Sequence, residues 1–493
     1  MGKTGKALKK RKLALAAQAA QATLEAGSDD ELGGEASFLG GLVSEGQLAV
    51  TVKTLQTLTQ HPHLLAHKQD LKALRTAVFD FQRVGNELAG TGNSLSSRIS
   101  AALTQHRHVD ALVLLAEMRI RGQHPKLGAL QRWTRELDAA SRSDGSFGDE
   151  MALKVLDGVL RTCNEHLILT AEQEAALQQP KQGEVVVRQT AWAHREPSGE
   201  CIYDEVKAGK FPSPEDRERL ASAFSLLQET PGPERLPPNL HPALLYASRP
   251  GTIPLSSTPV RPVTRVEAPH VPGGFMLTDV LSPEECRSII GHAEAVGFKP
   301  DQPLGEEQTS VLAHNLYWLA DREFLDVFCA RFLHLVPQAI DGGRVTGINA
   351  RFRVYRYVPG SCYRPHIDGA WPASGVDPVT GEYLYDSSPA DKPQWSKLTL
   401  LIYLNDDFDN GCTTFFLPSS RPGTLNAFPI KPARGCAMVF VHGDARGSLL
   451  HEGSPVGEGG AKYVIRTEVL YETKPVGFGI GGKEGEVDEN VVA

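Results

Sequence analysis

The chain has 493 residues, of which 41% are hydrophobic and 22% charged, and its formal net charge is −8. This length allows two or three domains, and the composition is that of an ordinary soluble protein. The charge argues neither for nor against a nucleic-acid partner. No apolar run reaches the roughly 18–20 residues that a membrane-spanning helix needs, so no membrane association is expected.

The beginning of the chain and its cysteines bear on the compartment. Residues 1–47 start with a lysine-rich stretch and continue Gly-rich and polar, which predicts a basic, disordered tail. The run KKRK at 9–12 is either a solvated tail or a nuclear-import or RNA-contact patch. Seven cysteines without a CxxC pair indicate reduced thiols, so we expect an intracellular protein of the cytoplasm or nucleus.

Residues 48–180 have apolar residues at spacings of three and four, which predicts an α-helical region. The clearest part, 99–137, is broken by Gly122 and Pro125 between two helices. The sequence of this stretch resembles one pentatricopeptide repeat. A solenoid needs about three or more units to bury a continuous core, so we predict a small helical region that could bind a partner.

The composition changes twice more. Residues 181–265 are rich in proline and polar residues, which predicts a linker. A helix is expected over 280–298, where Ser282, Pro283 and Glu285 form the pattern of an N-cap, a first-turn proline and a capping box. Short alternating segments then predict β-strands at 348–358, 398–406, 411–417, 435–443 and 462–471. Residues 476–493 read as a loose tail.

These elements predict an α+β protein, with a C-terminal barrel or double-sheet jelly roll over residues 266–475. Within it, His366 and Asp368 are two residues apart, so on a strand both side chains share one face. His451 lies just after another predicted strand. Two histidines and one carboxylate on one face of iron leave positions open for a cosubstrate and dioxygen. Alone, this spacing is a weak signal, because short motifs recur by chance.

A buried dicarboxylate cosubstrate would need a cation at its far end. The period of two in the segment 462–471 places Lys462, Val464, Arg466 and Glu468 on one face. The same period groups Thr399, Leu401 and Tyr403 in the segment 398–406. In the segment 348–358 it groups Tyr355 and Tyr357. A strand with two cations so soon after His451 fits a carboxylate anchor.

The order of these blocks resembles the prolyl 4-hydroxylase-like Fe(II)/2-oxoglutarate dioxygenases, over about residues 268–473. The family pattern Y-x-x-G-x-x-Y-x-P-H-x-D is met by YVPGSCYRPHID, residues 357–368. The segment DFDNGCTTFFLP resembles the pattern F-x-G-G-x-T-x-F, with Asn410 in place of the first glycine. The segment HEGSPVGEGGAKYVIRTEVLY resembles the closing block, with a slightly longer turn before Lys462. Several blocks in this order indicate the superfamily with high specificity, but they indicate the substrate with much lower specificity.

The resemblance implies a double-stranded β-helix and assigns roles to individual residues. It implies iron ligands at His366, Asp368 and His451. It implies that Lys462 binds the far carboxylate of 2-oxoglutarate, with Arg466 as the fallback or a second contact. Residues implied to line the cosubstrate pocket are Tyr357 and Tyr403, with Tyr363 as a further candidate. The alternatives are that Tyr357 and Tyr403 are core aromatics, that Arg466 pairs with Glu468, and that His314 and His442 are surface or supporting histidines.

The implied activity is hydroxylation of a prolyl or other residue of a protein. Fe(II) is the implied metal, 2-oxoglutarate and O2 are consumed, succinate and carbon dioxide are formed, and ascorbate is the expected reductant. The long segment 371–397 follows the HxD pair, where it could border the substrate or form a surface excursion. The alternative is an inactive dioxygenase fold that acts as a binding module through its helical region.

Overall fold

The computed structural model describes residues 42–473 except for 62–63, 66–69, 92–93, 138, 140, 142–145, 164, 199–200, 236–237, 260, 303–312 and 445. It has two compact units, Met1–Val78 and Phe79–Ala493. The first contains α2 (Glu45–Gln60), which begins with a capping box between Ser44 and Gln47. Helix α3 (Lys72–Thr91) starts in the first unit and continues into the second. None of the described helices is long and apolar enough to cross a membrane.

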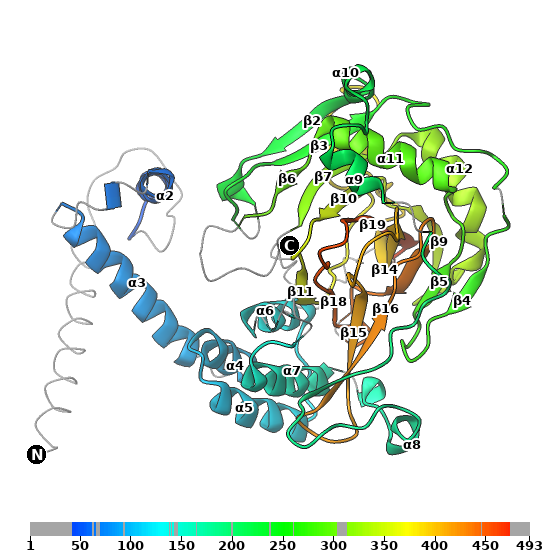
Figure 1. Cartoon of the computed structure of the whole chain (residues 1–493). Coiled ribbons are helices and arrows are strands. Elements are labelled where there is room, and N and C mark those ends of the chain that lie inside the picture. The colour runs from blue at the N-terminus through cyan, green and yellow to red at the C-terminus, as the bar shows by residue number, and fades with distance from the viewer. Residues whose placement is uncertain are drawn as a thin grey trace, which may run out of the picture. The chain divides into compact units, whose positions relative to one another are not determined.

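The second unit is built on a 12-stranded and a 5-stranded sheet (Figure 1). The large sheet contains β2 (Phe224–Thr230), β3 (Ala243–Ser248), β4 (Arg265–Glu267), β5 (Phe275–Leu277), β6 (Lys299–Pro300), β7 (His314–Leu319), β8 (Ala339–Ile340), β9 (Gly343–Ile348), β10 (Arg351–Tyr357), β14 (Gln394–Tyr403), β17 (Ala437–Val441) and β19 (Lys462–Glu472). The small sheet contains β1 (Val186–Arg188), β16 (Leu425–Ile430), β15 (Thr413–Pro418), β18 (His451–Gly453) and β11 (Tyr363–His366). A separate pair is formed by β12 (Gly375–Val376) and β13 (Tyr383–Leu384). Each of the five predicted strand segments overlaps an observed strand, and the α+β class is confirmed.

The remaining α-helices of the second unit are α4 (Leu95–Thr104), α5 (His108–Ile120), α6 (Leu127–Leu137), α7 (Glu150–Cys163), α8 (Ala171–Glu174), α9 (Ile202–Lys207), α10 (Pro214–Ala221), α11 (Pro283–Val296) and α12 (Arg322–Phe332). Helix α11 begins as predicted, because Ser282 and Glu285 bond each other's backbone N–H. The stretch 99–137 contributes to three helices rather than two. Besides the break at Gly122, the chain turns at His106, whose φ is +52°.

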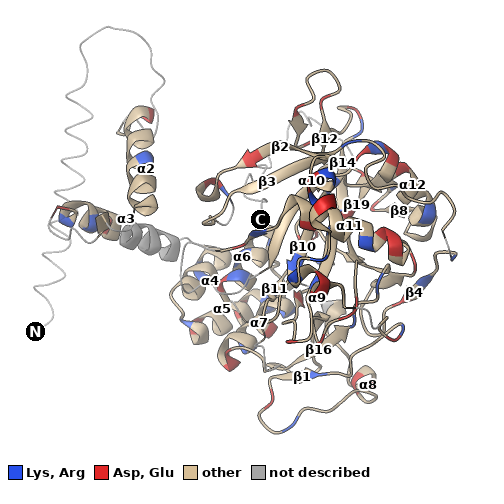
Figure 2. Ribbon diagram, turned by 45° about the horizontal axis from the view of Figure 1, so that its top comes forward, with Lys and Arg blue, Asp and Glu red and all other residues tan. Residues whose placement is uncertain are grey.

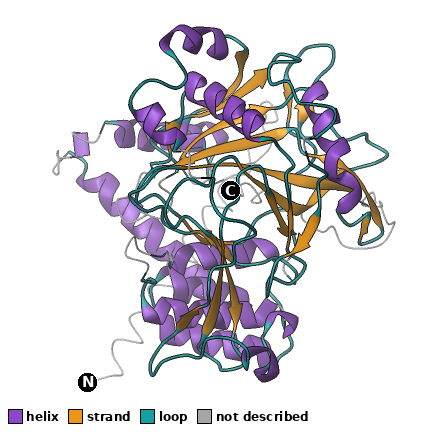
Figure 3. Ribbon diagram, turned by 45° about the vertical axis from the view of Figure 1, so that its right-hand side comes forward, coloured by secondary structure: helices purple, strands orange, loops and turns teal. Residues whose placement is uncertain are grey.

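The second unit has four layers, two sheets between two layers of helices, and alternate side chains of a strand point to opposite sides of its sheet. On β10, Phe352 and Val354 pack with α11 and α12, whereas Tyr355 and Tyr357 face a core shared with the small sheet. On β15, Phe415 joins that shared core and Phe416 packs against the cluster of α4 to α7. The two sheets therefore face each other, with helices on both outer sides (Figure 3).

The structure does not separate the predicted linker, or the helices α4 to α7, from the two sheets. The segment 181–265 is not a linker, because β1 pairs with β16, β2 pairs with β3, and β3 pairs with β7. Its prolines lie between these short strands, so they break the sequence pattern without preventing pairing. The helices α4 to α7 lie on the small sheet, where the Arg161 guanidinium donates to the Ser419 carbonyl over 2.6 Å. The predicted tail 476–493 and the basic stretch at 9–12 lie outside the described residues.

Candidate active site

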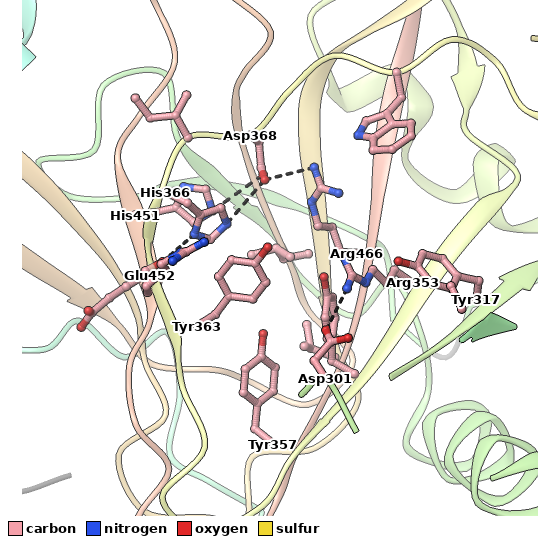
Figure 4. Close-up of a pocket in the computed structure, with 18 of the residues that line it drawn as sticks. Asp301, Tyr317, Arg353, Tyr357, Tyr363, His366, Asp368, His451, Glu452 and Arg466 are labelled. Atoms are coloured by element: carbon pink, nitrogen blue, oxygen red, sulfur yellow. Dashed lines mark hydrogen bonds and ion pairs between the residues drawn. The ribbon is translucent and has the colours of Figure 1, made fainter. Parts of the chain in front are cut away.

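Three potential metal-binding side chains meet at one edge of the small sheet. His366 ends β11, Asp368 follows two residues later, and His451 begins β18, where it lies directly opposite His366. One ligand atom from each of the three lies within 4.8 Å of the others. His366 Nε2 is 3.5 Å from Asp368 Oδ1, and His451 Nε2 is 3.7 Å from Asp368 Oδ2. The predicted triad is thus brought together in space (Figure 4).

The backbone fixes the orientation of both imidazoles. His366 Nδ1 is 2.7 Å from the Arg364 carbonyl oxygen, and His451 Nδ1 is 3.0 Å from the Leu449 carbonyl oxygen. A carbonyl only accepts, so each Nδ1 carries a hydrogen and Nε2 is the ring nitrogen left for a metal. Burial, followed by the charge of His366, lowers the pKa of His451 to about 3. Both rings therefore present Nε2 to Asp368 as a potential metal ligand.

A chain of buried hydrogen bonds supports Asp368 from the large sheet. The Thr399 hydroxyl donates to Asp368 Oδ2 over 2.6 Å, so the Thr399 oxygen must accept from His442 Nδ1, also 2.6 Å away. His442 Nε2 then accepts from the Ser396 hydroxyl at 2.7 Å, and Ser396 accepts the Trp371 N–H at 2.8 Å. Burial lowers the pKa of His442 to about 3, so this ring is neutral. Each of these four hydrogen bonds therefore has one defined donor and one defined acceptor.

Arg466 is paired with two carboxylates. Its guanidinium lies 3.0 Å from Asp368 Oδ1 and 3.2 Å from Glu468 Oε1. Burial alone would raise the pKa of Asp368, but Arg466 and then His451 hold it well below its usual range. Asp368 is therefore ionised and ready to bind a cation.

Lys462 lies at the other side of the same space. It is 3% exposed, and its Nζ donates to the Gly411 carbonyl over 2.8 Å. The ammonium lies 5.4 Å from the ring centre of Tyr357 and 5.7 Å from that of Tyr403. Burial lowers the pKa of Lys462 to about 8, so it is mostly charged at neutral pH. No carboxylate lies within ion-pair distance of Lys462 in the part of the chain that the structure describes.

One cavity of about 280 Å³ connects these groups. Its lining includes the whole triad and the predicted face of β19, which consists of Lys462, Val464, Arg466 and Glu468. Tyr357, Tyr363 and Thr413 line it as well, whereas Tyr403 lies behind, with its hydroxyl 2.8 Å from that of Thr413. From the segment 371–397 only Trp371 borders the cavity. The cavity thus lies between the sheets, with the triad on one and the basic anchor on the other.

Sequence reasoning assigned no role to Thr413 or to Thr399. Thr413 occupies the threonine of the F-x-G-G-x-T-x-F pattern, and this signal could have identified it. Asn410 replaces a glycine of that pattern and has a φ of +58°, a conformation that asparagine tolerates better than most residues. Thr399 had no signal in sequence spacing, because its bond to Asp368 joins distant segments. His442, expected as a surface or supporting histidine, is buried and supports Asp368 through Thr399.

No protein-family model and no curated protein matches the chain. Among solved structures it is similar to the viral collagen prolyl hydroxylase of Paramecium bursaria Chlorella virus-1 in complex with 2-oxoglutarate. That match has 21% identity and a TM-score of 0.26, and covers 41% of this chain and 97% of the viral chain.

Two further prolyl hydroxylases are similar over the same share of this chain. For the Pseudomonas putida prolyl-4-hydroxylase the identity is 15% and the TM-score 0.24, over 41% of this chain and 93% of that one. For the Trichoplax adhaerens prolyl hydroxylase, in complex with a hypoxia inducible factor peptide fragment, the identity is 17% and the TM-score 0.28, over 41% of this chain and 84% of that one. These TM-scores are low, so the residues of the cavity themselves carry the functional proposal.

Proposed function

We propose that the chain is an Fe(II)- and 2-oxoglutarate-dependent dioxygenase that hydroxylates a protein residue, with a prolyl residue as the first candidate. The observation that carries this proposal is one cavity with a His-Asp-His triad on one sheet and a buried lysine on the other. The two facing sheets also support the predicted double-stranded β-helix.

The donor set fits iron. Two imidazoles and one carboxylate leave open positions at the metal, which is the ligand set of non-haem Fe(II) oxygenases. His366, Asp368 and His451 would hold the ion, and the bonds to Nδ1 and to Asp368 Oδ2 already fix the orientation of each ligand. When bound, the iron supplies the oxidative chemistry of 2-oxoglutarate and O2, which no side chain in the cavity can supply.

The chain's own residues would bind and orient 2-oxoglutarate. Lys462 is the better anchor for its far carboxylate, because it is buried, charged at neutral pH and free of an ion pair among the described residues. Arg466 is occupied by Asp368 and Glu468, of which the alternative interpretation of the sequence expected only Glu468. Tyr357 and Thr413 line the space beside Lys462 and would exclude water from the cosubstrate.

The reaction can be tested without knowing the substrate. Purified protein is supplied with Fe(II), ascorbate and 2-oxoglutarate labelled at its first carboxylate, and release of labelled carbon dioxide is measured. We expect slow release from the wild type and none from His366→Ala. His314→Ala is the matched control, because His314 bonds Arg356 and does not line the cavity. Substrates would appear as additions of about 16 Da that are lost with His366→Ala, as one transferred oxygen requires.

The other candidate function is an inactive fold that serves as a binding module. It would be supported if the purified protein neither bound Fe(II) nor released carbon dioxide with any cell extract. The oriented imidazoles and the ionised Asp368 argue against it, because a scaffold needs no open set of metal ligands.

A further inference from the structure

One guanidinium of the cavity wall, that of Arg351, is held by aromatic rings. Arg351 begins β10 and lines the cavity together with the alternate residues Arg353, Tyr355 and Tyr357 of that strand. Its central carbon lies 4.5 Å from the ring centre of Tyr317 and 4.9 Å from that of Trp371. Both rings are buried and line the cavity as well, so they restrict the orientation of the guanidinium.

The N–H groups of Arg351 remain available for a ligand. Contacts with aromatic rings need no hydrogen bond from a guanidinium, whose N–H donors lie in its plane. In the part of the chain that the structure describes, no hydrogen bond or ion pair involves the Arg351 side chain. The residue is half-buried, so its donors are open to a group that enters the cavity.

The charged neighbours of Arg351 are bonded to other partners. Arg353, next on the same face of β10, pairs with Asp301 over 3.0 Å. The charges of Arg351 and Glu468 attract each other. However, Glu468 is bonded to Arg466 at 3.2 Å, and among the described residues no ion pair joins it to Arg351. Arg351 is therefore the more accessible guanidinium at this end of the sheet.

Arg351 and Lys462 lie at opposite ends of one face of the large sheet. Lys462 is paired with Tyr357, the last residue of β10, whereas Arg351 is the first residue of that strand. A strand of seven residues spans about 20 Å. Between the two ends, Arg466 of β19 holds Asp368 of the triad. In the proposed reaction 2-oxoglutarate extends from Lys462 to the metal, so the end at Arg351 is left for the substrate.

Other segments of the chain complete the wall of the cavity. Gln131 and Arg135 of α6 line it, and Gln131 Nε2 donates to the carbonyl of Ile367 over 3.2 Å. Glu234 and Asn239, from the connection between β2 and β3, line it too. A substrate that reaches the triad would contact these segments, which suits an extended chain such as a peptide.

A single guanidinium with free donors fits a carboxylate, which it binds through two parallel hydrogen bonds. A phosphate group carries up to about two charges at neutral pH, and a nucleic acid requires several cations. The chain as a whole has a net charge of −8, and basic and acidic residues are interspersed along the ribbon of the second unit (Figure 2). A ligand with one negative charge therefore matches this end of the cavity best.

We propose that Arg351 binds a carboxylate of the substrate and thereby determines which substrates reach the triad. The inference rests on the proposed function for the peptide nature of the substrate and for the place of 2-oxoglutarate. In a peptide, the carboxylate belongs either to an acidic side chain or to the C-terminus, and the test separates these sources. Trp371, the first residue of the long segment 371–397, would contribute by holding Arg351 in place.

The test measures binding rather than turnover. The full chain is loaded with Mn²⁺ and 2-oxoglutarate, and fluorescence anisotropy gives its affinity for four labelled peptide pools. All pools share a central proline. Their flanking residues are enriched in Asp and Glu or in Asn and Gln, and each version is made with a free or an amidated C-terminus. We expect the pools with the recognised carboxylate to bind about tenfold tighter, as for one charge-assisted hydrogen bond.

Arg351→Gln should abolish this preference, because it removes the charge and the paired donors. Arg344→Gln is the matched control, since Arg344 is exposed on β9 of the same sheet and does not line the cavity. It should keep the preference. Equal binding of all four pools by the wild type would overturn the proposal, as would equal losses in the two variants. An oligonucleotide that binds more tightly than every pool, and less tightly to Arg351→Gln, would also overturn it.

Competition in the wild type locates the bound carboxylate without any variant. The preference is measured with Mn²⁺ alone and again with saturating 2-oxoglutarate. A carboxylate at Arg351 does not meet the cosubstrate, so the preference should stay the same. If 2-oxoglutarate abolishes the preference, the peptide carboxylate binds at Lys462 and the proposal is wrong.

Carbon dioxide release is measured on the same preparations with Fe(II) in place of Mn²⁺, so the two proposals fail separately. Release without a preference for any carboxylate contradicts the role of Arg351 alone. A preference that is lost in Arg351→Gln, with no release under any condition, supports the carboxylate site and contradicts the dioxygenase.

Discussion

Arg466 lies 3.0 Å from Asp368 Oδ1 and joins the large sheet to the segment that follows β11 of the small sheet. The guanidinium also reaches Glu468 on its own strand, so one cation holds two buried carboxylates. In the absence of a metal, this arrangement compensates the charge of Asp368. A bound metal ion would take over part of that task, which couples the stability of the fold to metal binding.

Replacing Arg466 by methionine should therefore destabilise the metal-free protein by about 3–5 kcal/mol, because both carboxylates lose their partner. Addition of Mn²⁺, a redox-stable substitute for Fe(II), should restore more stability in this variant than in the wild type. Urea unfolding midpoints with and without Mn²⁺ measure both effects. Arg356→Met is the control, since Arg356 pairs with Glu294 and does not line the cavity. An equal response to Mn²⁺ in both variants would show that Arg466 does not act through the metal site.

The lowered pKa of Lys462 predicts a pH dependence for cosubstrate binding. Its charged form, which binds a carboxylate, predominates below its pKa of about 8 and is lost as the pH rises through that value. The KM for 2-oxoglutarate should therefore rise above about pH 8 in the wild type and stay flat in Lys462→Arg, because arginine remains protonated. Lys462→Ala should raise the KM at least about tenfold at pH 7, where the wild-type lysine is charged, and by less above pH 8, while Mn²⁺ still binds. A wild-type KM that does not change with pH, together with an unaltered KM in Lys462→Ala, would assign the anchor to Arg466.

Thr399 connects His442 to Asp368 through two hydrogen bonds, although neither Thr399 nor His442 is a proposed metal ligand. Thr399→Val keeps the shape of the side chain but removes both hydrogen bonds, so metal affinity should fall about 10–100-fold. Titration with Mn²⁺, followed by calorimetry, gives the affinity. Thr162→Val is the control, because that buried hydroxyl bonds Val159 of α7 and has no connection to the triad. Unchanged affinity in Thr399→Val would mean that the sheet alone positions Asp368.

Local periodicity explains what could be predicted from the sequence. The faces of β10, β14 and β19 follow from alternation within each strand, so the grouping of Lys462 with Arg466 was correct. The partners of β1 and β3 could not be predicted, because these short strands are defined only by pairing with residues far away in the chain. The same holds for Arg135, whose helix pattern identifies a buried face but not the cavity beside the other face.

The packing of α4 to α7 on the small sheet predicts that residues 266–475, the proposed dioxygenase region, do not fold alone. A fragment of residues 266–475 lacks β1 and these helices, and it would expose Phe416, Leu425 and Leu450 to water. We expect this fragment to aggregate, because a contiguous apolar face on a sheet attracts other copies. A fragment of residues 79–493, which keeps the second unit intact, should be soluble and unfold cooperatively on heating. The two fragments are compared by their soluble yield and by thermal unfolding followed by circular dichroism. If the 266–475 fragment were monomeric and unfolded cooperatively, the helices would be dispensable for the fold.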